Sequence, residues 1–262
     1  MTYSLITFEK EKGVGLIRLN RPDDGNALIP EMARELLDAA IRCDEDPEIR
    51  AVVMTGNGKM FCAGGDLKAF AAQGEKASHY IREITQAFHA AISRFNWMDP
   101  PVVGAINGTA AGGGFSLALA TDIAIAAASA KFTMAYTKAG LAPDGSSSYF
   151  LARMVGMRRA KEMALLNPIL SAAQAMEWGL VNQVVADDQV LPVALEIAHR
   201  LAKGPTRSFG ETKRLMLAGA TESLESQMEM ESRVIAAMVR SADAREGIAA
   251  FMAKRAPKFH GE

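Results

Sequence analysis

The chain has 262 residues, a formal net charge of −1 and an apolar share of 49%. This length can bury a sizeable core, in one domain or in one domain with an appendage. The near-neutral charge argues against a nucleic-acid binder, which usually carries an excess of Lys and Arg. Only two cysteines occur, the N-terminus lacks a basic-then-apolar leader, and the apolar runs are too short to cross a bilayer. We therefore expect a soluble, cytoplasmic protein without a membrane partner.

Short apolar runs alternate with helical patterns along most of the chain. A helix is expected from Pro30, with Met32, Leu36, Leu37, Ala40 and Ile41 on one face. Alternation of this kind predicts an α/β architecture with parallel strand pairing. The predicted strands are Ser4–Phe8 and Val14–Leu19 around a turn at residues 10–13, then Ala51–Thr55, Val102–Ile106 and Ile123–Ala126, with a helix from about Gly74 to Phe95 before the last two.

The strand signals stop at about Pro192. From there helical patterns take over, and breaks are expected near Gly204-Pro205 and at residues 218–220. The sequence therefore predicts two parts, an α/β core over residues 1–191 and a helical C-terminal region over residues 192–262.

Two glycine-rich corners each follow a predicted strand. One is Phe61–Leu67 (FCAGGDL) and the other is Asn107–Gly114 (NGTAAGGG), which opens a helix. Adjacent glycines allow close backbone approach and leave N–H groups free at a helix start. Two such corners on neighbouring strands can direct two N–H donors at one oxygen, as an oxyanion hole requires. Taken singly, each corner is more typical of a tight turn, and neither matches a dinucleotide fingerprint or a phosphate loop.

Together these motifs resemble the crotonase (enoyl-CoA hydratase/isomerase) superfamily. The resemblance implies a spiral of ββα units followed by a helical C-terminal trimerisation region, assembled as a homotrimer or as a homohexamer built from two trimers. It also implies an acyl-CoA thioester substrate, with coenzyme A present as part of the substrate and no permanently bound cofactor. The residues that carry it are Asn20-Arg-Pro22, Ala27, Phe61–Leu67, Ala105–Gly108, Ala111–Gly114, Ser129–Phe132 and Arg245–Arg255.

In such proteins the thioester oxygen lies between two backbone N–H groups, which map here to Gly65 and Gly113. The resemblance places Lys254 and Phe251 where a neighbouring subunit reaches the nucleotide end of CoA. From the residue type alone, Lys254 is equally typical of a solvated helix end. The positions expected to line the pantetheine and adenine path are Ala27, Ala63, Leu67 and Lys68.

The chain departs from the hydratases at both of their catalytic glutamates. Ser116 and Tyr136 occupy these positions, and neither has a pKa suited to general base work near neutrality. Asp144 offers another carboxylate, just before a predicted helix at Tyr149–Val155. It is typical of a helix N-cap, but it also matches the catalytic aspartate of two subgroups. These are the enoyl-CoA isomerase group of phenylacetate degradation, which acts on ring epoxides or double bonds, and the 4-chlorobenzoyl-CoA dehalogenase group.

Different segments of the chain resemble different ones of these two subgroups. Residues 129–144 and the C-terminal tail look like the isomerase, whereas residues 145–159 look like the dehalogenase. His89 matches the dehalogenase histidine, although Tyr136 and Gly65 replace its tryptophan and phenylalanine. A histidine among apolar helix neighbours is more often a satisfied core or surface residue than a catalytic one, and the other alternative for His89 is that it orders water or a substrate group. The other histidines lack ligand spacing, and no metal site is predicted.

Three hypotheses follow. The first is an acyl-CoA isomerase, or an isomerase-like lyase, in which Asp144 is the acid/base and Gly65 and Gly113 hold the enolate oxygen, with Tyr136 among the catalytic candidates. The second is an aryl-CoA hydrolytic dehalogenase with Asp144 as nucleophile and His89 as base. The third is a non-catalytic acyl-CoA binder.

Overall fold

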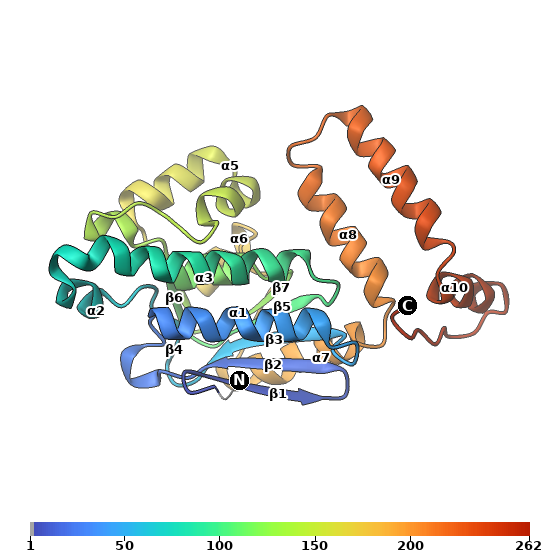
Figure 1. Cartoon of the computed structure of the whole chain (residues 1–262), viewed down its shortest axis with the longest axis horizontal. Coiled ribbons are helices and arrows are strands. Elements are labelled where there is room, and N and C mark those ends of the chain that lie inside the picture. Colours follow the sequence, from blue (N-terminus) through green and yellow to red (C-terminus); the bar gives the residue numbers. More distant parts are fainter. Residues whose placement is uncertain (1–2) are drawn as a thin grey trace.

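The structure, a computed structural model, describes residues 3–262 and contains a six-stranded sheet (Figure 1). Its first strand is antiparallel to its neighbour, and all the other pairs are parallel. The predicted parallel α/β architecture is therefore confirmed. In spatial order the strands are β1 (Ile6–Glu11), β2 (Val14–Leu19), β3 (Ala51–Gly56), β5 (Val102–Ile106), β7 (Ile123–Ala127) and β10 (Gln183–Val185).

The first hairpin differs from the prediction at its start and at its turn. The strand begins at Ile6, and the N–H groups of Ser4, Leu5 and Ile6 all donate to the Glu35 carboxylate. It then runs on to Glu11 through charged residues, which pair with β2. The turn is therefore Lys12-Gly13, and both residues have positive φ (50° and 81°), as a two-residue hairpin turn requires.

The strand patterns did not predict a second, four-stranded sheet, although the ββα units implied by the resemblance include a second strand each. The strands of this sheet are only two or three residues long, so they carry no readable alternation of apolar and polar residues. In β3–β4, β5–β6 and β7–β8, a strand of the large sheet is followed directly by a strand of the small sheet and then by a helix. Each unit is displaced by one strand from the last, which produces a spiral. The small sheet has the order β4 (Met60–Cys62), β6 (Thr109–Ala111), β8 (Lys131–Thr133) and β9 (Leu170–Ser171).

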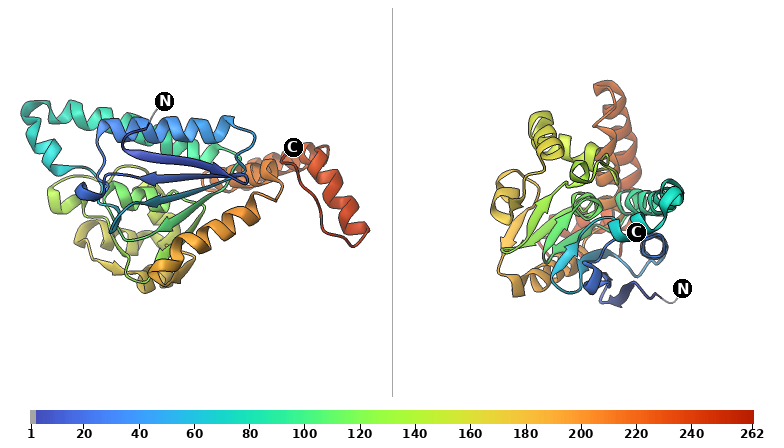
Figure 2. Two further views of the ribbon diagram at one scale, coloured as in Figure 1. Left: turned by 90° about the horizontal axis from the view of Figure 1, so that it is seen from below. Right: turned by 90° about the vertical axis from the view of Figure 1, so that its left-hand side faces the viewer.

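Helices cover both faces of the large sheet (Figure 2). On one face lie α1 (Pro30–Glu45) and α3 (Ala77–Trp97), and α7 (Val190–Leu201) packs on the other against β3, β5 and β7. Pro30 opens α1 and Met32 and Leu36 are fully buried, as expected, but Ile41 is 38% exposed and Cys43 takes its place in the core. Because α7 begins at Val190, the predicted division after residue 191 falls inside a helix that covers the sheet.

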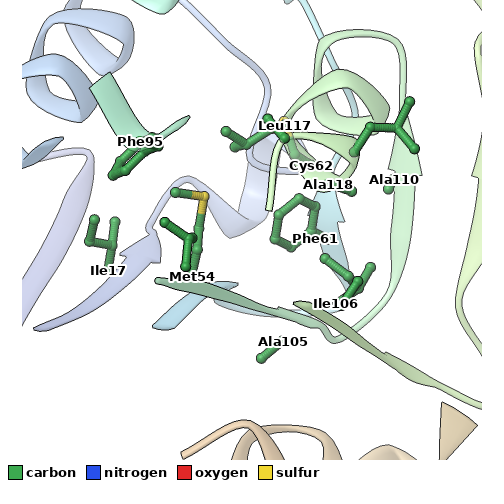
Figure 3. Packing of buried hydrophobic residues seen from close by; sticks show 14 of the residues in the cluster. Ile17, Met54, Phe61, Cys62, Phe95, Ala105, Ile106, Ala110, Leu117 and Ala118 are labelled. Atoms are coloured by element: carbon green, nitrogen blue, oxygen red, sulfur yellow. The ribbon is translucent and has the colours of Figure 1, made fainter. Parts of the chain in front are cut away.

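The core continues from the large sheet to the small one (Figure 3). Met54 of β3 and Ile106 of β5 lie near Phe61 of β4, and all three side chains are at most 1% exposed. Leu117 belongs to α4 (Gly113–Leu119), every residue of which is buried. A fully buried short helix cannot shift relative to its strands without opening a cavity.

Two further predicted helices of the α/β part are present with shifted boundaries. A short 3₁₀ turn at Gly74–Lys76 precedes α3, so the helix begins at Ala77 and continues to Trp97. The predicted Tyr149–Val155 helix is the first half of α5 (Ser147–Leu166), which Gly156 interrupts with non-helical φ and ψ. The two other helices of this part are α2 (Leu67–Ala72) and α6 (Ala172–Glu177).

The C-terminal region is helical, and its end projects away from the sheets (Figures 1 and 2). Lys213 of α8 (Thr206–Ala218) connects it to the core through an ion pair with Asp122 at 2.8 Å. Antiparallel to α8 runs α9 (Leu224–Met238), and α10 (Ala242–Met252) follows. The predicted break at Gly204-Pro205 falls between α7 and α8, and the one at residues 218–220 begins at the last residue of α8. No helix within residues 3–262 is long and apolar enough to span a bilayer.

We predict that Gly114→Ala lowers the free energy of unfolding by roughly 1–3 kcal/mol or more, because its methyl group meets rigid backbone. A Cβ at Gly114 of α4 would lie 2.1 Å from the Cys62 carbonyl oxygen at the end of β4. Urea unfolding followed by circular dichroism measures the change. The control is Gly219→Ala, where φ is −59° and the nearest atom is 3.4 Å from the added Cβ. Equal stability of the two variants would contradict the close packing of α4 on β4.

Candidate active site

The first glycine corner is held by a single β-bridge between Leu28 and Gly65. The Leu28 N–H donates to the Gly64 carbonyl at 2.7 Å, and the Asp66 N–H donates to the Leu28 carbonyl at 3.1 Å. In a parallel bridge of this kind the residue between the two bonded neighbours directs its own N–H the other way. The Gly65 N–H therefore points away from Leu28.

The second corner ends at Gly113, the first residue of α4. An N–H at this position has no acceptor within its own helix. The two corners meet at Gly64, whose φ is +95°. A Cβ there would lie 2.8 Å from the Ala111 carbonyl and 3.0 Å from the Gly113 nitrogen. Both Gly65 and Gly113 line one cavity, as the prediction of an oxyanion hole requires.

This cavity has a volume of about 310 Å³ and is mainly apolar. Leu28, Phe70, Ile84 and Leu141 contribute to its wall. Among its lining residues within the described part of the chain, Asp144 carries the only carboxylate, and no Lys, Arg or His is present. The Gly65 and Gly113 backbones and the Asp144 carboxylate thus line one cavity.

Asp144 does not cap the helix that follows it. The residue before α5 is Ser146, which makes no side-chain cap. The Asp144 carboxylate instead accepts a hydrogen bond from the Tyr136 hydroxyl at 2.5 Å on Oδ1, and Oδ2 lies 3.4 Å from His89 Nε2. The Asp144 carbonyl accepts from the Ser147 N–H and from the Ser147 and Ser116 hydroxyls. The backbone is therefore fixed while the carboxylate faces the cavity.

Tyr136 and Ser116, at the two hydratase glutamate positions, form one hydrogen-bonded group with Asp144. Ser116 is fully buried, and its hydroxyl lies 2.9 Å from that of Tyr136. Burial, together with the neighbouring Asp144 charge, raises the pKa of Tyr136 above its ordinary value near 10. The phenol consequently stays neutral and donates a hydrogen bond to the carboxylate.

His89 contacts the turn that carries Asp144. The Gly145 N–H donates to His89 Nε2 at 3.0 Å, and a ring nitrogen that accepts a hydrogen bond carries no proton. The lone pair on Nε2 is therefore already engaged, and the ring proton resides on Nδ1. The 3.4 Å contact with Asp144 becomes an ion pair only when the ring is protonated.

Comparison with known proteins shows to which family the chain belongs. The model of the enoyl-CoA hydratase/isomerase family matches residues 9–262. The chain belongs to the enoyl-CoA hydratase/isomerase family. The predicted resemblance to crotonases and the predicted fold class are thereby confirmed.

Relatives from both expected subgroups are found within this family. The 1,2-epoxyphenylacetyl-CoA isomerase of Escherichia coli K12 is 40% identical over 253 residues, which are 96% of this chain and 97% of that protein. The 4-chlorobenzoyl coenzyme A dehalogenase-2 of Arthrobacter sp. is 38% identical over 251 residues, covering 95% and 91%. The crystal structure of an enoyl-CoA hydratase from Polaromonas sp. JS666 matches with a TM-score of 0.93 at 34% identity, covering 97% of this chain and 99% of that chain.

The residues expected along the CoA path fall into two groups. Ala63 and Leu67 line the cavity beside Gly65, Ala27 precedes the bridge residue Leu28, and Lys68 is exposed in the first turn of α2. Phe251 and Lys254, by contrast, lie in and just after α10, at the opposite end of the molecule from α2 (Figure 1). Within one chain the structure does not bring these two residues to the cavity.

Two positioning groups were not predicted. The Arg21 guanidinium donates to the Ala27 carbonyl and pairs with Asp66 at 3.2 Å. Burial opposes ionisation of Asp66, but the Ala69 N–H and Arg21 together lower the pKa of its carboxyl. Asn26 is fully buried, and its amide donates to three backbone carbonyls of residues 57–61. A short polar residue next to a glycine was the only available signal, and it is equally typical of a turn.

We predict that Tyr136→Phe lowers kcat about ten- to a hundredfold, because a hydrogen bond to a charged group contributes about 1.5–3 kcal/mol. The substrate is the acyl-CoA that the wild type turns over. The control is Tyr80→Phe, whose hydroxyl makes no hydrogen bond within residues 3–262. Because the raised pKa keeps Tyr136 protonated, wild-type kcat should stay level between about pH 8 and pH 10. An alkaline fall in this range that Tyr136→Phe lacks would contradict this assignment.

Proposed function

We propose that the protein is an acyl-CoA isomerase, moving a double bond or opening a ring epoxide, with Asp144 as its single acid/base. The observation that carries the proposal is that Asp144 is the one carboxylate in the described lining of the oxyanion cavity. The 40% identity to a 1,2-epoxyphenylacetyl-CoA isomerase supports it. Hydration by a pair of carboxylates is disfavoured, because Ser116 and a neutral Tyr136 occupy the positions of the two hydratase glutamates.

For a 3-enoyl-CoA the proton transfer is balanced with one carboxylate. Asp144 takes a proton from C2, and the electron pair moves through the thioester carbonyl to its oxygen. The Gly65 and Gly113 N–H groups stabilise the resulting dienolate oxygen. Asp144 then returns the proton to C4, which leaves the double bond between C2 and C3. Each backbone donor of this kind contributes about 10²–10³ in rate.

Hydrolytic dehalogenation is the second candidate. It would use Asp144 as the nucleophile on a ring carbon and His89 as the base for water, and the 38% identical dehalogenase relative supports it. Against it, His89 Nε2 already accepts the Gly145 N–H and lacks the free lone pair that a base needs. The third candidate, a non-catalytic acyl-CoA binder, is opposed by the Asp144–Tyr136 hydrogen bond inside the oxyanion cavity.

The CoA moiety is proposed to run past Ala27, Ala63, Leu67 and Lys68, with Phe251 and Lys254 supplied by a neighbouring subunit. The position of α10 far from its own cavity supports the contribution from a neighbour. Lysine suits this role as a point charge near phosphate. A cytoplasmic location is proposed as well, since Cys43 and Cys62 are both buried, unpaired thiols.

We predict that Asp144→Asn lowers isomerisation of 3-enoyl-CoA at least a thousandfold while acyl-CoA binding changes less than about threefold, because general acid–base catalysis contributes up to about 10⁴. The purified protein is incubated in D₂O with 3-enoyl-, 2-enoyl- and 4-halobenzoyl-CoA, and products are identified by mass spectrometry. Formation of 2-enoyl-CoA from 3-enoyl-CoA, absent in the variant, is the expected result, and deuterium in its chain would show that the Asp144 proton exchanges with solvent between the two transfers. Full activity of Asp144→Asn would overturn the proposal.

His89→Gln separates the first two candidates within the same experiment. A glutamine oxygen can accept the Gly145 N–H but cannot act as a base, so isomerisation should persist in this variant, whereas a dehalogenase would lose water activation. Halide release from 4-halobenzoyl-CoA over many turnovers, which His89→Gln limits to the first turnover because Asp144 stays arylated, would establish the second candidate. CoA thioester binding with no product from the whole panel would establish the third.

A homotrimer or a hexamer of two trimers is proposed for the assembly. Its support is the unpaired apolar surface of the C-terminal helices, where Leu224 is 69%, Ile235 71% and Met252 77% exposed. Light scattering should give three or six times the chain mass of 28.0 kDa. Ile235→Glu should lower this mass, because a charge is costly in an apolar interface. Glu225→Gln at the start of the same helix should not, and a monomeric wild type would overturn the proposal.

A further inference from the structure

A second cavity, of about 610 Å³, adjoins the one that contains Asp144. It lies between the C-terminal half of α3, the start of α5 and the α8–α9 connection. His89 and Gly145 belong to its wall, and they contact Asp144 in space and in sequence, respectively. The catalytic carboxylate therefore lies at the boundary between the two cavities.

One face of α3 runs along both cavities. Ile81 and Thr85 line the first cavity, and His89, Ser93 and Asn96 line the second. Spacings of three and four residues place these side chains in one stripe along the helix. From His89 to Trp97 the stripe extends about 12 Å, at 1.5 Å per residue.

The opposite wall is continuous as well. Leu141, Ala142 and Asp144 line the first cavity, and the chain then passes without a gap to Gly145 and Tyr149, which line the second. A molecule whose reacting carbons lie at Asp144 thus meets the same two walls as it extends beyond them. The two cavities lie end to end along one groove.

The chemistry of the second cavity excludes the phosphates of CoA. Among residues 3–262, its lining contains no Lys or Arg, and the one carboxylate there, Glu222, would repel an anion. Aromatic and aliphatic side chains predominate, among them Trp97, Phe150, Leu217 and Met230. Such a surface gains free energy by burying an apolar, uncharged group.

We infer that the second cavity binds the distal part of the acyl group of the substrate, and that this acyl group is an extended apolar chain longer than a single ring. The inference rests on the proposed function, which places the thioester oxygen at Gly65 and Gly113 and the reacting carbons at Asp144. The remainder of the acyl group then follows the α3 stripe beneath the α8–α9 connection.

Two filling variants and two pairs of CoA compounds test this inference. Ser93→Trp and Leu217→Trp each place an indole in the second cavity, and Ala90→Trp, at an exposed position of α3 outside its lining, is the control. Turnover is measured with 3-hexenoyl-CoA and 3-dodecenoyl-CoA. Binding of the unreactive thioethers S-hexyl-CoA and S-dodecyl-CoA is measured by calorimetry.

In the wild type, kcat/KM should be at least about tenfold higher for 3-dodecenoyl-CoA than for 3-hexenoyl-CoA, and affinity at least about tenfold higher for S-dodecyl-CoA than for S-hexyl-CoA. The reason is that each buried methylene adds favourable free energy of binding. Both filling variants should remove this advantage of the twelve-carbon compounds, whereas Ala90→Trp should keep it. In both filling variants, kcat/KM for 3-hexenoyl-CoA and affinity for S-hexyl-CoA should stay within about twofold of the wild-type values. Equal affinity for both thioethers in the wild type, or an unchanged preference in both filling variants, would overturn the inference. Preferential dodecyl binding without turnover of either thioester would overturn the proposed function alone.

Discussion

The site depends on a backbone contact in which the two glycine corners touch at Gly64 and at residues 111–113. There is no room for a Cβ at Gly64, where φ is +95° and a methyl group would meet the Ala111 carbonyl at 2.8 Å. The contact follows from the spiral, because β4 and β6 are parallel neighbours and the glycines of each corner come soon after the strand ends, at residues 64–65 and 112–114. The Gly65 and Gly113 backbones, which belong to separate ββα units, thereby line one cavity.

Polar side chains hold this contact in place from outside the cavity. The Asn26 amide connects its own turn to the carbonyls of residues 57, 60 and 61, and the Asn107 amide accepts the Gly56 N–H and donates to the Gly58 carbonyl. Arg21 joins the Ala27 carbonyl to Asp66. Preorganised donors stabilise a developing oxyanion because they do not reorient during the reaction. These residues provide that rigidity for the Gly65 N–H.

Sequence patterns predicted the elements of the large sheet but not the small sheet. Val14–Leu19 and Val102–Ile106 are apolar runs of five or six residues and were predicted at their true bounds. β4, β6 and β8 have three residues each, too few for a periodicity, and their pairing is set by long-range register. Motifs indicated Gly65, Gly113 and Asp144. The Tyr136–Asp144 hydrogen bond and the His89–Gly145 contact, however, depend on how the 3₁₀ turn at Tyr136–Ala139 and helix α3 pack against residues 144–145. No local pattern specifies that packing.

The neutral Tyr136 phenol beside Asp144 affects whether the cavity is suited to hydration or to isomerisation. Because Tyr136 keeps its proton and donates a hydrogen bond to Oδ1, one oxygen of the carboxylate is engaged. In the proposed isomerisation, Oδ2 is the oxygen that exchanges a proton with the substrate. Activating water and also protonating a carbon requires two independent groups, whereas moving one proton between two carbons of the same dienolate requires only one. Replacement of the glutamate pair by Ser116 and Tyr136 therefore reorganises the site around a single carboxylate. The stripe of α3 that continues past His89 would then select among acyl groups without adding a second acid or base near the reacting carbons.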